Sequence, residues 1–328
     1  MRSIIHSAKL HLKFYMEFLR GTDFNKGLVA AMSAYTLRAV ASGMFVPYAI
    51  QDITNGLYNK SLGLVDRGLW LLAIAGILYI ATEWGFKPFW DEVARSIYLV
   101  KSNLVKSLKT RGDNRDTIGR LVSDVDFVMW NVGNVVNTFI PNIFTAIVAE
   151  ITIFEMSPTL GLVGLSGLPF YLIVLERYIK KVEEARSVER SAYSESVHAA
   201  SEYLEGRGSS DSFVGALNKW LRGIKRNILL DRFYWSSSFA ISYAVPIASM
   251  FLGIESVERG RMSVGALVGA LSASLTMNNA LINAFWGICL AGQNVVPIGR
   301  IFSVKQASVQ QKEALSRAQP AGPSRTQP

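Results

Sequence analysis

Cysteine and histidine are scarce in this sequence. The chain has one cysteine, Cys289, and three histidines, His6, His11 and His198. A lone cysteine has no partner for an intramolecular disulfide, and these side chains lack the spacing of a zinc site. Cys289 lies in an apolar run, where we expect a small buried core residue. Disulfide-based and metal-based chemistry are therefore not indicated.

A phosphate-binding loop is also lacking. The 328 residues contain no Gly-x-x-x-x-Gly-Lys-Ser/Thr pattern, in which backbone N–H groups and a lysine hold the phosphates of ATP. No Ser-His-Asp or Cys-His arrangement is evident, and His198 falls on a charged helical stretch that we expect to face water. We therefore expect this chain to be no enzyme by itself and to bind no cofactor or metal.

Long apolar runs are present instead. Hydrophobic residues make up 50% of the chain, and the mean hydropathy is +0.25. Because about 20 apolar residues in a helix span the hydrocarbon core of a bilayer, such runs predict membrane spans. We expect six of them, at Gly27–Ile50, Leu69–Phe86, Phe127–Phe154, Leu160–Leu175, Phe233–Ile254 and Val264–Val296. The predicted fold class is an all-α membrane protein with six transmembrane helices.

The two ends of the chain differ from this apolar body. Residues 1–26 mix Lys and Arg with Ile, Leu and Tyr, which predicts an amphipathic helix in the membrane interface and not a signal peptide. The Gln-, Ser-, Ala- and Pro-rich residues 304–328 predict a disordered tail. Residues 27–303 are then the expected transmembrane domain.

The basic charges set an orientation. The net charge is +9, and Lys and Arg gather in both terminal segments and in the long connections 87–126 and 176–232. The short connections carry few of them. The positive-inside rule then places both termini and both long connections in the cytoplasm of a multi-pass protein of the cell membrane. The basic balance is explained by topology and does not indicate nucleic-acid binding.

The stretch from Leu160 to Gly206 changes from apolar to charged without a stop signal. Pro169 is the only proline of its apolar part, and no Gly or Pro occurs from Phe170 to Leu204. We expect one continuous helix, roughly 65–70 Å long at about 1.5 Å per residue. Since the hydrocarbon core is about 30 Å thick, the helix extends into water beyond the bilayer. A return helix is predicted from Phe213.

The other long connection has the same design. The second span continues, with a kink at Pro88, to about Lys109, and the third starts near Thr117. Apolar residues such as Ile97 and Leu104 keep helical spacing between these points, which a disordered loop would not require. The sequence therefore predicts two helical hairpins that project into the cytoplasm, each with a short tip.

Five short motifs, in their order and spacing, resemble the transmembrane domain of ATP-binding cassette (ABC) exporters. They are Arg120-Leu121-Val122-Ser123-Asp124-Val125-Asp126, Leu160 with Leu168-Pro169, Glu202-Tyr203-Leu204-Glu205-Gly206, Gly260-Arg261-Met262-Ser263-Val264-Gly265, and Gly299-Arg300-Ile301-Phe302. Two departures stand out. Arg115 occupies a position where the family commonly has glycine, and Arg-Gly-Ser-Ser-Asp follows Gly206 where the family has an apolar-basic run.

This resemblance implies a function. The chain would be the membrane-spanning subunit of an ATP-driven exporter, paired with a second transmembrane subunit, identical or homologous. Separate ATPase subunits would bind ATP and magnesium and dock on tips near Lys109–Asp116 and Gly208–Leu217. The residues expected to couple to them are Arg111, Asp113, Arg115, Asp116, Ser209, Ser210, Asp211 and Phe213.

Polar residues inside the spans are candidates for a substrate pathway. They are Arg38, Glu83, Asn131, Asn134, Asn278, Asn279 and Trp286, with further amides at Asn137, Asn283 and Gln293. Ionisable groups at membrane depth usually face a cavity or one another. The competing interpretation is structural: Glu83 pairs with Lys87, Arg38 pairs with Glu83 or reaches the interface, and the amides bond across helices. Glu150 and Glu155 are expected at the outer interface.

Two other functions fit the same features. One is a regulatory or scaffold subunit that binds a partner at the tips without transporting anything. The other is a gradient-driven carrier that uses Arg38 and Glu83, although the broken mid-membrane helices and inverted repeats typical of such carriers are not evident. ATP-dependent flux would distinguish the exporter from both.

Overall fold

The computed structural model describes residues 2–20, 22–108 and 115–303, and within these ranges the chain is almost entirely helical, without a β-strand. Six helical stretches are long and apolar enough to cross a membrane. They are Phe24–Tyr58, Leu62–Lys106, Val122–Met156, Pro158–Leu204, Ser210–Glu258 and Val264–Ser303. The predicted six-span all-α fold is confirmed. The predicted tail at 304–328 lies outside the described residues.

The first span is longer than predicted. It comprises α2 (Phe24–Val40), a π-helical turn η2 (Ala41–Phe45) and α3 (Val46–Tyr58). The predicted segment ended at Ile50 because polar residues follow it. These find partners inside the protein: Asp52 is 4% exposed and accepts two hydrogen bonds of 2.6 Å from Arg67, and Asn55 accepts one from the Gly265 N–H at 3.0 Å.

The predicted extensions into long hairpins are confirmed, with changed boundaries. The second span consists of α4 (Leu62–Gly85) and α5 (Lys87–Leu108), which are separated at Phe86, close to the kink expected at Pro88. The third is one helix, α6 (Arg115–Met156), with Pro141 inside it.

The fourth span is divided where one unbroken helix was predicted. It consists of α7 (Pro158–Ser166) and α8 (Leu168–Leu204), and Gly167 separates them. Pro169 has no backbone N–H to donate to the preceding helical turn, and the Gly167 N–H bonds to Gly164 O, three residues back, at 3.3 Å. Beyond this turn, α8 runs to Leu204 without interruption, as the sequence predicts.

The return helix begins three residues before the predicted Phe213. It is α9 (Ser210–Glu258), and the Ser209 side chain caps it by accepting a hydrogen bond of 3.1 Å from the Ser212 N–H. The last span is α10 (Val264–Gln293), and after a turn at Asn294 the helical chain continues to Ser303. A serine cap, Ser263, also starts α10.

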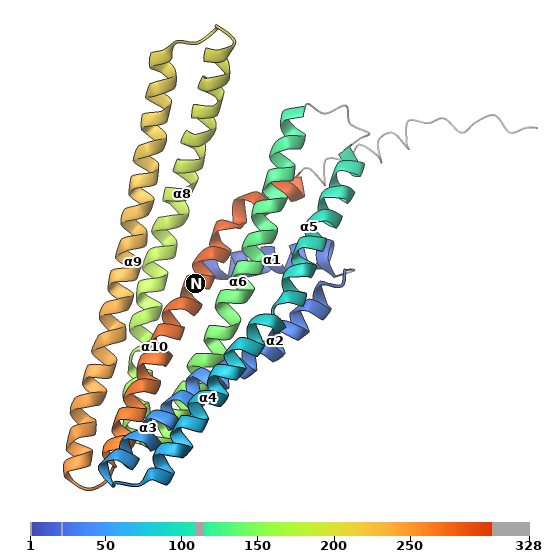
Figure 1. The fold of residues 1–328 in the computed structure, drawn as a ribbon. Helices are drawn as coiled ribbons and strands as arrows, with labels where there is room; N and C mark the ends of the chain where they lie inside the picture. The colour runs from blue at the N-terminus through green and yellow to red at the C-terminus, as the bar shows by residue number, and fades with distance from the viewer. Residues whose placement is uncertain (1, 21, 109–114, 304–328) are drawn as a thin grey trace, which may run out of the picture.

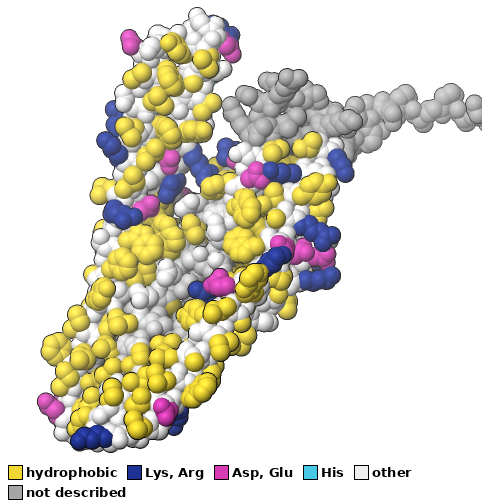
Figure 2. Space-filling view, in the orientation of Figure 1, with side chains coloured by type: hydrophobic (Ala, Val, Ile, Leu, Met, Phe, Trp, Pro, Cys, Tyr) yellow, Lys and Arg dark blue, Asp and Glu magenta, His cyan; other side chains and the backbone are white. Residues whose placement is uncertain are grey.

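The helices run between two ends of the molecule (Figure 1). Three short turns, at 59–61, 157 and 259–263, gather at what we call the turn end. At the opposite hairpin end, α8 and α9 project furthest as a long pair, and α5 and α6 form a second, separate projection. Hydrophobic side chains dominate the half of the surface nearer the turn end, and charged side chains are spread over the hairpin half (Figure 2). This distribution fits a membrane region with extensions into water.

Two hydrophobic clusters form the core, and α6 belongs to both. The first joins α6 to α2, α5 and the segment after Asn294, with Phe89, Val125 and Ile301 fully buried. The second joins α6 to α7, α8, α9 and α10, with Tyr171 and Tyr234 at its centre. The central position of α6 means that any rearrangement of one cluster against the other must involve this helix.

The N-terminal segment is helical, as predicted, and forms α1 (Arg2–Phe14), followed by a π-helical turn η1 (Tyr15–Leu19). Figure 1 shows α1 lying across the direction of the spans. Phe14 is 1% exposed in the first cluster, and the Lys13 ammonium lies 4.6 Å from the centre of the Phe302 ring. The helix is therefore attached to the end of the last span, and its place in a membrane interface stays a prediction.

Two of the motifs have structural roles at helix ends. Gly206 ends α8 with φ +73° and Gly260 precedes α10 with φ +66°, conformations that suit glycine. Gly265 lies so close to α3 that a Cβ there would be 2.4 Å from the Gln51 carbonyl oxygen. Glycine at these positions therefore sets the turn of the hairpin and the close packing of α10 on α3.

Candidate functional site

A polar cavity lies between the two core clusters. Its volume is about 400 Å³, within the range of small-molecule sites. Helices from the first three spans and the last span contribute to it. The lining residues are Arg38, Ser42, Val46, Tyr79, Asn137, Pro141, Asn142, Thr145, Thr276, Asn279, Ala280 and Asn283. Most of these carry an amide or a hydroxyl group, so the cavity offers hydrogen-bond donors and acceptors.

One ion pair borders the cavity. Arg38 on α2 donates a 2.7 Å hydrogen bond to Glu83 on α4, and its guanidinium lies 5.2 Å from the centre of the Tyr79 ring. The expected Glu83–Lys87 pair is wrong: Lys87 bonds to Asp91 at 2.5 Å. The break at Phe86 puts Glu83 and Lys87 on different helices, whereas Lys87 and Asp91 share a face of α5.

The amides of the cavity come from one face of α6 and one of α10. Asn137 accepts a 3.1 Å hydrogen bond from the Tyr35 hydroxyl, and Asn142 donates one of 2.6 Å to the Thr138 carbonyl. On α10, Asn283 donates one of 2.9 Å to the Asn279 carbonyl. Asn142 was not among the predicted pathway residues, although it continues the three-to-five-residue spacing of the asparagines before it.

Several predicted pathway residues lie outside the cavity lining. Asn131 is buried and donates to the Leu290 carbonyl at 2.9 Å and to Asn294 Oδ1 at 2.8 Å. Asn278 is buried and accepts a 2.9 Å hydrogen bond from the Tyr171 hydroxyl. These contacts tie α6 and α8 to the last span, as the structural interpretation of the amides expected.

The remaining two are also separate. Asn134 is exposed and does not line the cavity. Trp286 belongs to an aromatic cluster, with ring centres 5.3 Å from Trp235 and 5.6 Å from Tyr234. The structure therefore brings Arg38, Asn279 and, through its ion pair, Glu83 to one site, and it distributes the other predicted residues among helix contacts and the surface.

The α8–α9 hairpin is fastened along its length. Near the membrane region, Asn227 on α9 donates a 2.7 Å hydrogen bond to Glu189 on α8. Further out, Lys219 donates one of 2.5 Å to Glu195. At the tip, the rings of Tyr203 and Phe213 stack with centres 6.4 Å apart. Contacts at three levels make the hairpin a paired rod, able to transmit a displacement from its tip.

The tip of this hairpin is formed by residues 205–209 and the first turn of α9. Ser209 caps α9, Ser210 and Asp211 are exposed in its first turn, and Phe213 is partly covered by Tyr203. Residues 210–217 continue directly into α9 and form no separate short helix. Of the other predicted tip, Arg111 and Asp113 lie outside the described residues. Arg115 and Asp116 begin α6, and their side chains are not described.

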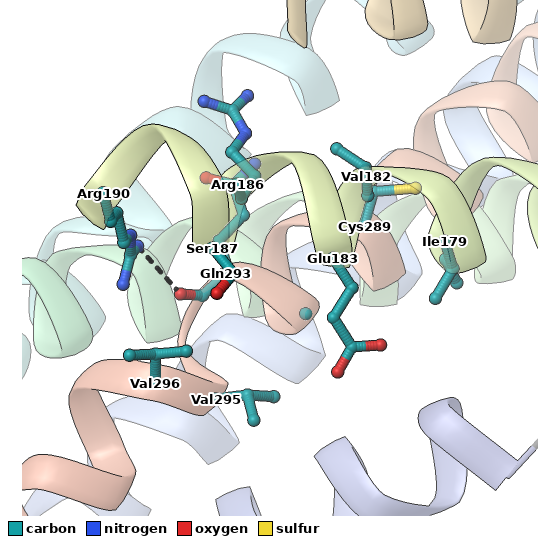
Figure 3. Close-up of a pocket in the computed structure, with 11 residues that line it drawn as sticks. Ile179, Val182, Glu183, Arg186, Ser187, Arg190, Cys289, Gln293, Val295 and Val296 are labelled. Carbon is teal, nitrogen blue, oxygen red and sulfur yellow. Dashed lines mark hydrogen bonds between the residues drawn. The ribbon is translucent and has the colours of Figure 1, made fainter. Parts of the chain in front are cut away.

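The base of the hairpin contacts α6 and the end of α10. Arg190 on α8 donates a 3.2 Å hydrogen bond to the Gln293 carbonyl at the end of α10, and its guanidinium lies 5.3 Å from the centre of the Phe127 ring on α6. Figure 3 shows Arg190 directed toward Gln293 at one end of a groove between α8 and α10. The groove holds about 50 Å³, space for a water molecule or two.

Two motif carboxylates join the same region. Asp124 on α6 accepts a 2.8 Å hydrogen bond from Arg300, and Asp126 accepts one of 2.6 Å from Lys101 on α5. The motif residue between them, Val125, is fully buried. The motif at 120–126 therefore connects three helices where the hairpins leave the membrane region.

Comparison with known proteins gives one finding. The family described as the ABC transporter transmembrane region matches residues 116–207. The matched residues run from the start of α6, through its cavity-lining face, to the end of α8 and the first residues of the tip. A search of curated proteins finds no match. Residues 116–207 are therefore similar to the transmembrane region of ABC transporters, and with the six candidate spans the chain is a multi-pass membrane protein.

Proposed function

We propose that this chain is the membrane-spanning subunit of an ATP-driven exporter. The cavity between α2, α4, α6 and α10 is the substrate pathway, and the hairpins receive force from ATPase domains that lie outside these 328 residues. A second transmembrane subunit completes the pathway. The observation that carries the proposal is a cavity of about 400 Å³, lined by amides and hydroxyls, whose α6 wall belongs to the segment that matches ABC transporters.

The position of the cavity supports this function. It lies between two hydrophobic clusters that share α6, so movement of one cluster against the other changes its shape. Its lining is polar in the midst of apolar spans, an arrangement that is costly in lipid and usual in translocation pathways. The Arg38–Glu83 pair closes the α2–α4 side without leaving an unpaired charge.

The hairpin supports a role in coupling. ATP-driven closure of the ATPase domains would displace the tip at residues 205–213, and the fastened pair α8–α9 would carry that displacement to its base. There Arg190 touches both α6 and α10, the two helices that supply most of the cavity lining. The ATPase domains would bind ATP and magnesium, and the chain itself would supply no catalytic residue.

Orientation follows from charge in this proposal. The hairpins carry most of the lysines and arginines, so the positive-inside rule places the hairpin end in the cytoplasm and the turn end outside the cell membrane. Both termini then lie on the cytoplasmic side. The export direction is inferred from the long hairpins, which resemble those of ABC exporters.

Reconstitution tests the proposal. The chain and its cognate ATP-binding cassette protein are placed in proteoliposomes, and ATP-dependent flux and stimulated ATPase activity are measured over a panel of polar solutes. We expect flux with at least one solute and a higher solute concentration for half-maximal stimulation in Asn142→Ala and Asn279→Ala, with Asn134→Ala as the matched control outside the cavity. Bound ATPase without flux would favour the scaffold function, and flux that an ionophore abolishes would favour the gradient-driven carrier.

A further inference from the structure

Glu150 is a buried carboxyl group without a partner. It lies on α6 near the turn end, where the sequence predicts a position at the outer interface. Its depth in a membrane stays a prediction, but its side chain does not face out of the protein: Glu150 is 9% exposed, and neither carboxyl oxygen has a hydrogen-bond partner among the described residues. Ser249, on α9, also has a buried hydroxyl without a partner. A carboxyl group in this situation requires an explanation, because buried polar groups are normally paired.

Glycines of α7 bring that helix close over Glu150. A Cβ on Gly164 would lie 2.7 Å from Glu150 Oε2, and one on Gly161 would lie 2.6 Å from the Phe154 ring. Because Gly164 has no side chain, helix α7 can lie directly over the carboxyl group of Glu150. Removing this cover requires α7 to move away from α6.

The packing of α7 on α9 indicates the level of Ser249 in the bundle. Positions 167 and 245 face each other, with 2.9 Å from a Cβ on Gly167 to Val245, and positions 160 and 253 do so at 3.6 Å. Ser249 lies midway between 245 and 253, and Gly164 lies midway between 160 and 167. Ser249 therefore lies on α9 at about the level of Gly164.

No positive charge faces this site from the packed elements. Helix α7, turn η2 and the α10 segment 264–283 contain no ionisable residue, and the α9 segment 238–253 contains only Tyr243, which is 62% exposed. On α3, the Tyr48 hydroxyl bonds to Glu155 at 2.5 Å and Asp52 bonds to Arg67. Tyr58, also on α3, is 74% exposed. An ionised Glu150 would therefore be buried without a counter-ion.

We propose that Glu150 is a proton-binding site. In this conformation it is a neutral carboxylic acid, since the ionised form would lose its hydration and gain no cation in exchange. When α7 separates from α6, water from the turn end reaches the group and the carboxyl O–H bond breaks, with the proton passing to water and the carboxylate remaining. Rebinding one proton accompanies closure. Proton occupancy of Glu150 then reports and biases the state of the α6–α7 junction.

The test uses the full chain in detergent, with Glu150→Gln as a neutral replacement of the same shape. Thermal unfolding is measured from about pH 5 to about pH 8, with Glu155→Gln as the matched control on the same helix. If folded Glu150 keeps its proton, the unfolded chain releases it above the ordinary carboxyl range and stability falls as the pH rises. Glu150→Gln lacks this loss, so its advantage over the natural protein grows by about 2–4 °C per pH unit.

Infrared spectroscopy supplies a second readout that does not depend on unfolding. The C=O stretch of a protonated carboxyl group at neutral pH should be present in the natural protein and in Glu155→Gln. It should be lost in Glu150→Gln and shifted in Glu150→Asp. A stability difference that does not change with pH, or an infrared spectrum in which Glu150→Gln removes only a carboxylate band, would overturn the proposal. If Glu150→Gln fails to fold, the spectra of the natural protein and Glu150→Asp decide it.

Discussion

Asn131 on α6 and Asn279 on α10 should respond to substitution in different ways. Asn131 is 8% exposed and donates two hydrogen bonds to the end of the last span. Asn279 is exposed toward the cavity, and no hydrogen bond of its side chain is described. If the cavity is the pathway, Asn131→Ala should affect stability and Asn279→Ala should affect transport.

The magnitudes follow from these contacts. Asn131→Ala loses two interhelical bonds, each worth about 0.6 kcal/mol in a membrane protein, and leaves Asn294 Oδ1 without this donor. We expect a total loss of about 1–3 kcal/mol in the free energy of unfolding. Asn279→Ala should change this quantity by less than about 0.5 kcal/mol, as for exposed substitutions generally. A lost contact to a polar substrate, about 1–2 kcal/mol, would weaken half-maximal stimulation about 5–30-fold.

Both quantities are measurable on one preparation. Thermal unfolding in detergent reports stability, and the substrate concentration for half-maximal ATPase stimulation in proteoliposomes reports the pathway. The reasoning is refuted if Asn131→Ala abolishes stimulation at unchanged stability. It is equally refuted if Asn279→Ala unfolds the protein while the surviving fraction is stimulated normally.

Three further substitutions test the helix contacts. Gly265→Ala should destabilise the protein by about 1–3 kcal/mol in thermal unfolding, because its Cβ would lie 2.4 Å from the Gln51 carbonyl oxygen. Gly215→Ala, whose Cβ would enter open space on α9, should be neutral or stabilising in the same measurement. Arg190→Ala should lower the flux per ATP hydrolysed, because it removes the hydrogen bond between the base of the hairpin and the Gln293 carbonyl. Lys219→Ala, midway along the hairpin, is the control and should leave that ratio within about twofold. Gly206→Ala should lower the free energy of unfolding by about 1 kcal/mol, since φ +73° strains alanine. Limited proteolysis should then cut the variant at residues 203–210, where the tip has opened. An unchanged digestion pattern would count against this role of Gly206.

The sequence predicts the spans and hairpins well because their signals are local. Apolar runs of bilayer length give the six spans, and the lack of Gly and Pro from Phe170 to Leu204 gives the long α8. The boundaries that differ depend on tertiary partners. Asp52 and Asn55 end the apolar run of the first span, yet Arg67 and the Gly265 N–H allow the helix to continue to Tyr58.

The cavity is less predictable, because it depends on which way each helix face turns. Arg38 and Asn279 are identifiable as polar groups in apolar spans, and both line it. Asn278 has the same composition signal as Asn279, but one residue along a helix changes the direction by about 100°, and Asn278 bonds to Tyr171 instead. Rotation of a span about its axis is set by packing among distant segments, which composition does not record.

The central claim is that the α8–α9 hairpin projects into the cytoplasm and meets an ATP-binding cassette domain. Single cysteines at Ser210, near its tip, and at Lys60, at the turn end, can be introduced in a Cys289→Ser background and labelled with a membrane-impermeant maleimide. We predict that the cysteine at 210 reacts only in inside-out vesicles and is protected by the cassette protein, whereas the cysteine at 60 reacts only in right-side-out vesicles. Labelling at 210 from the outside of the cell, or labelling from the inside that no cassette protein reduces, would contradict the account.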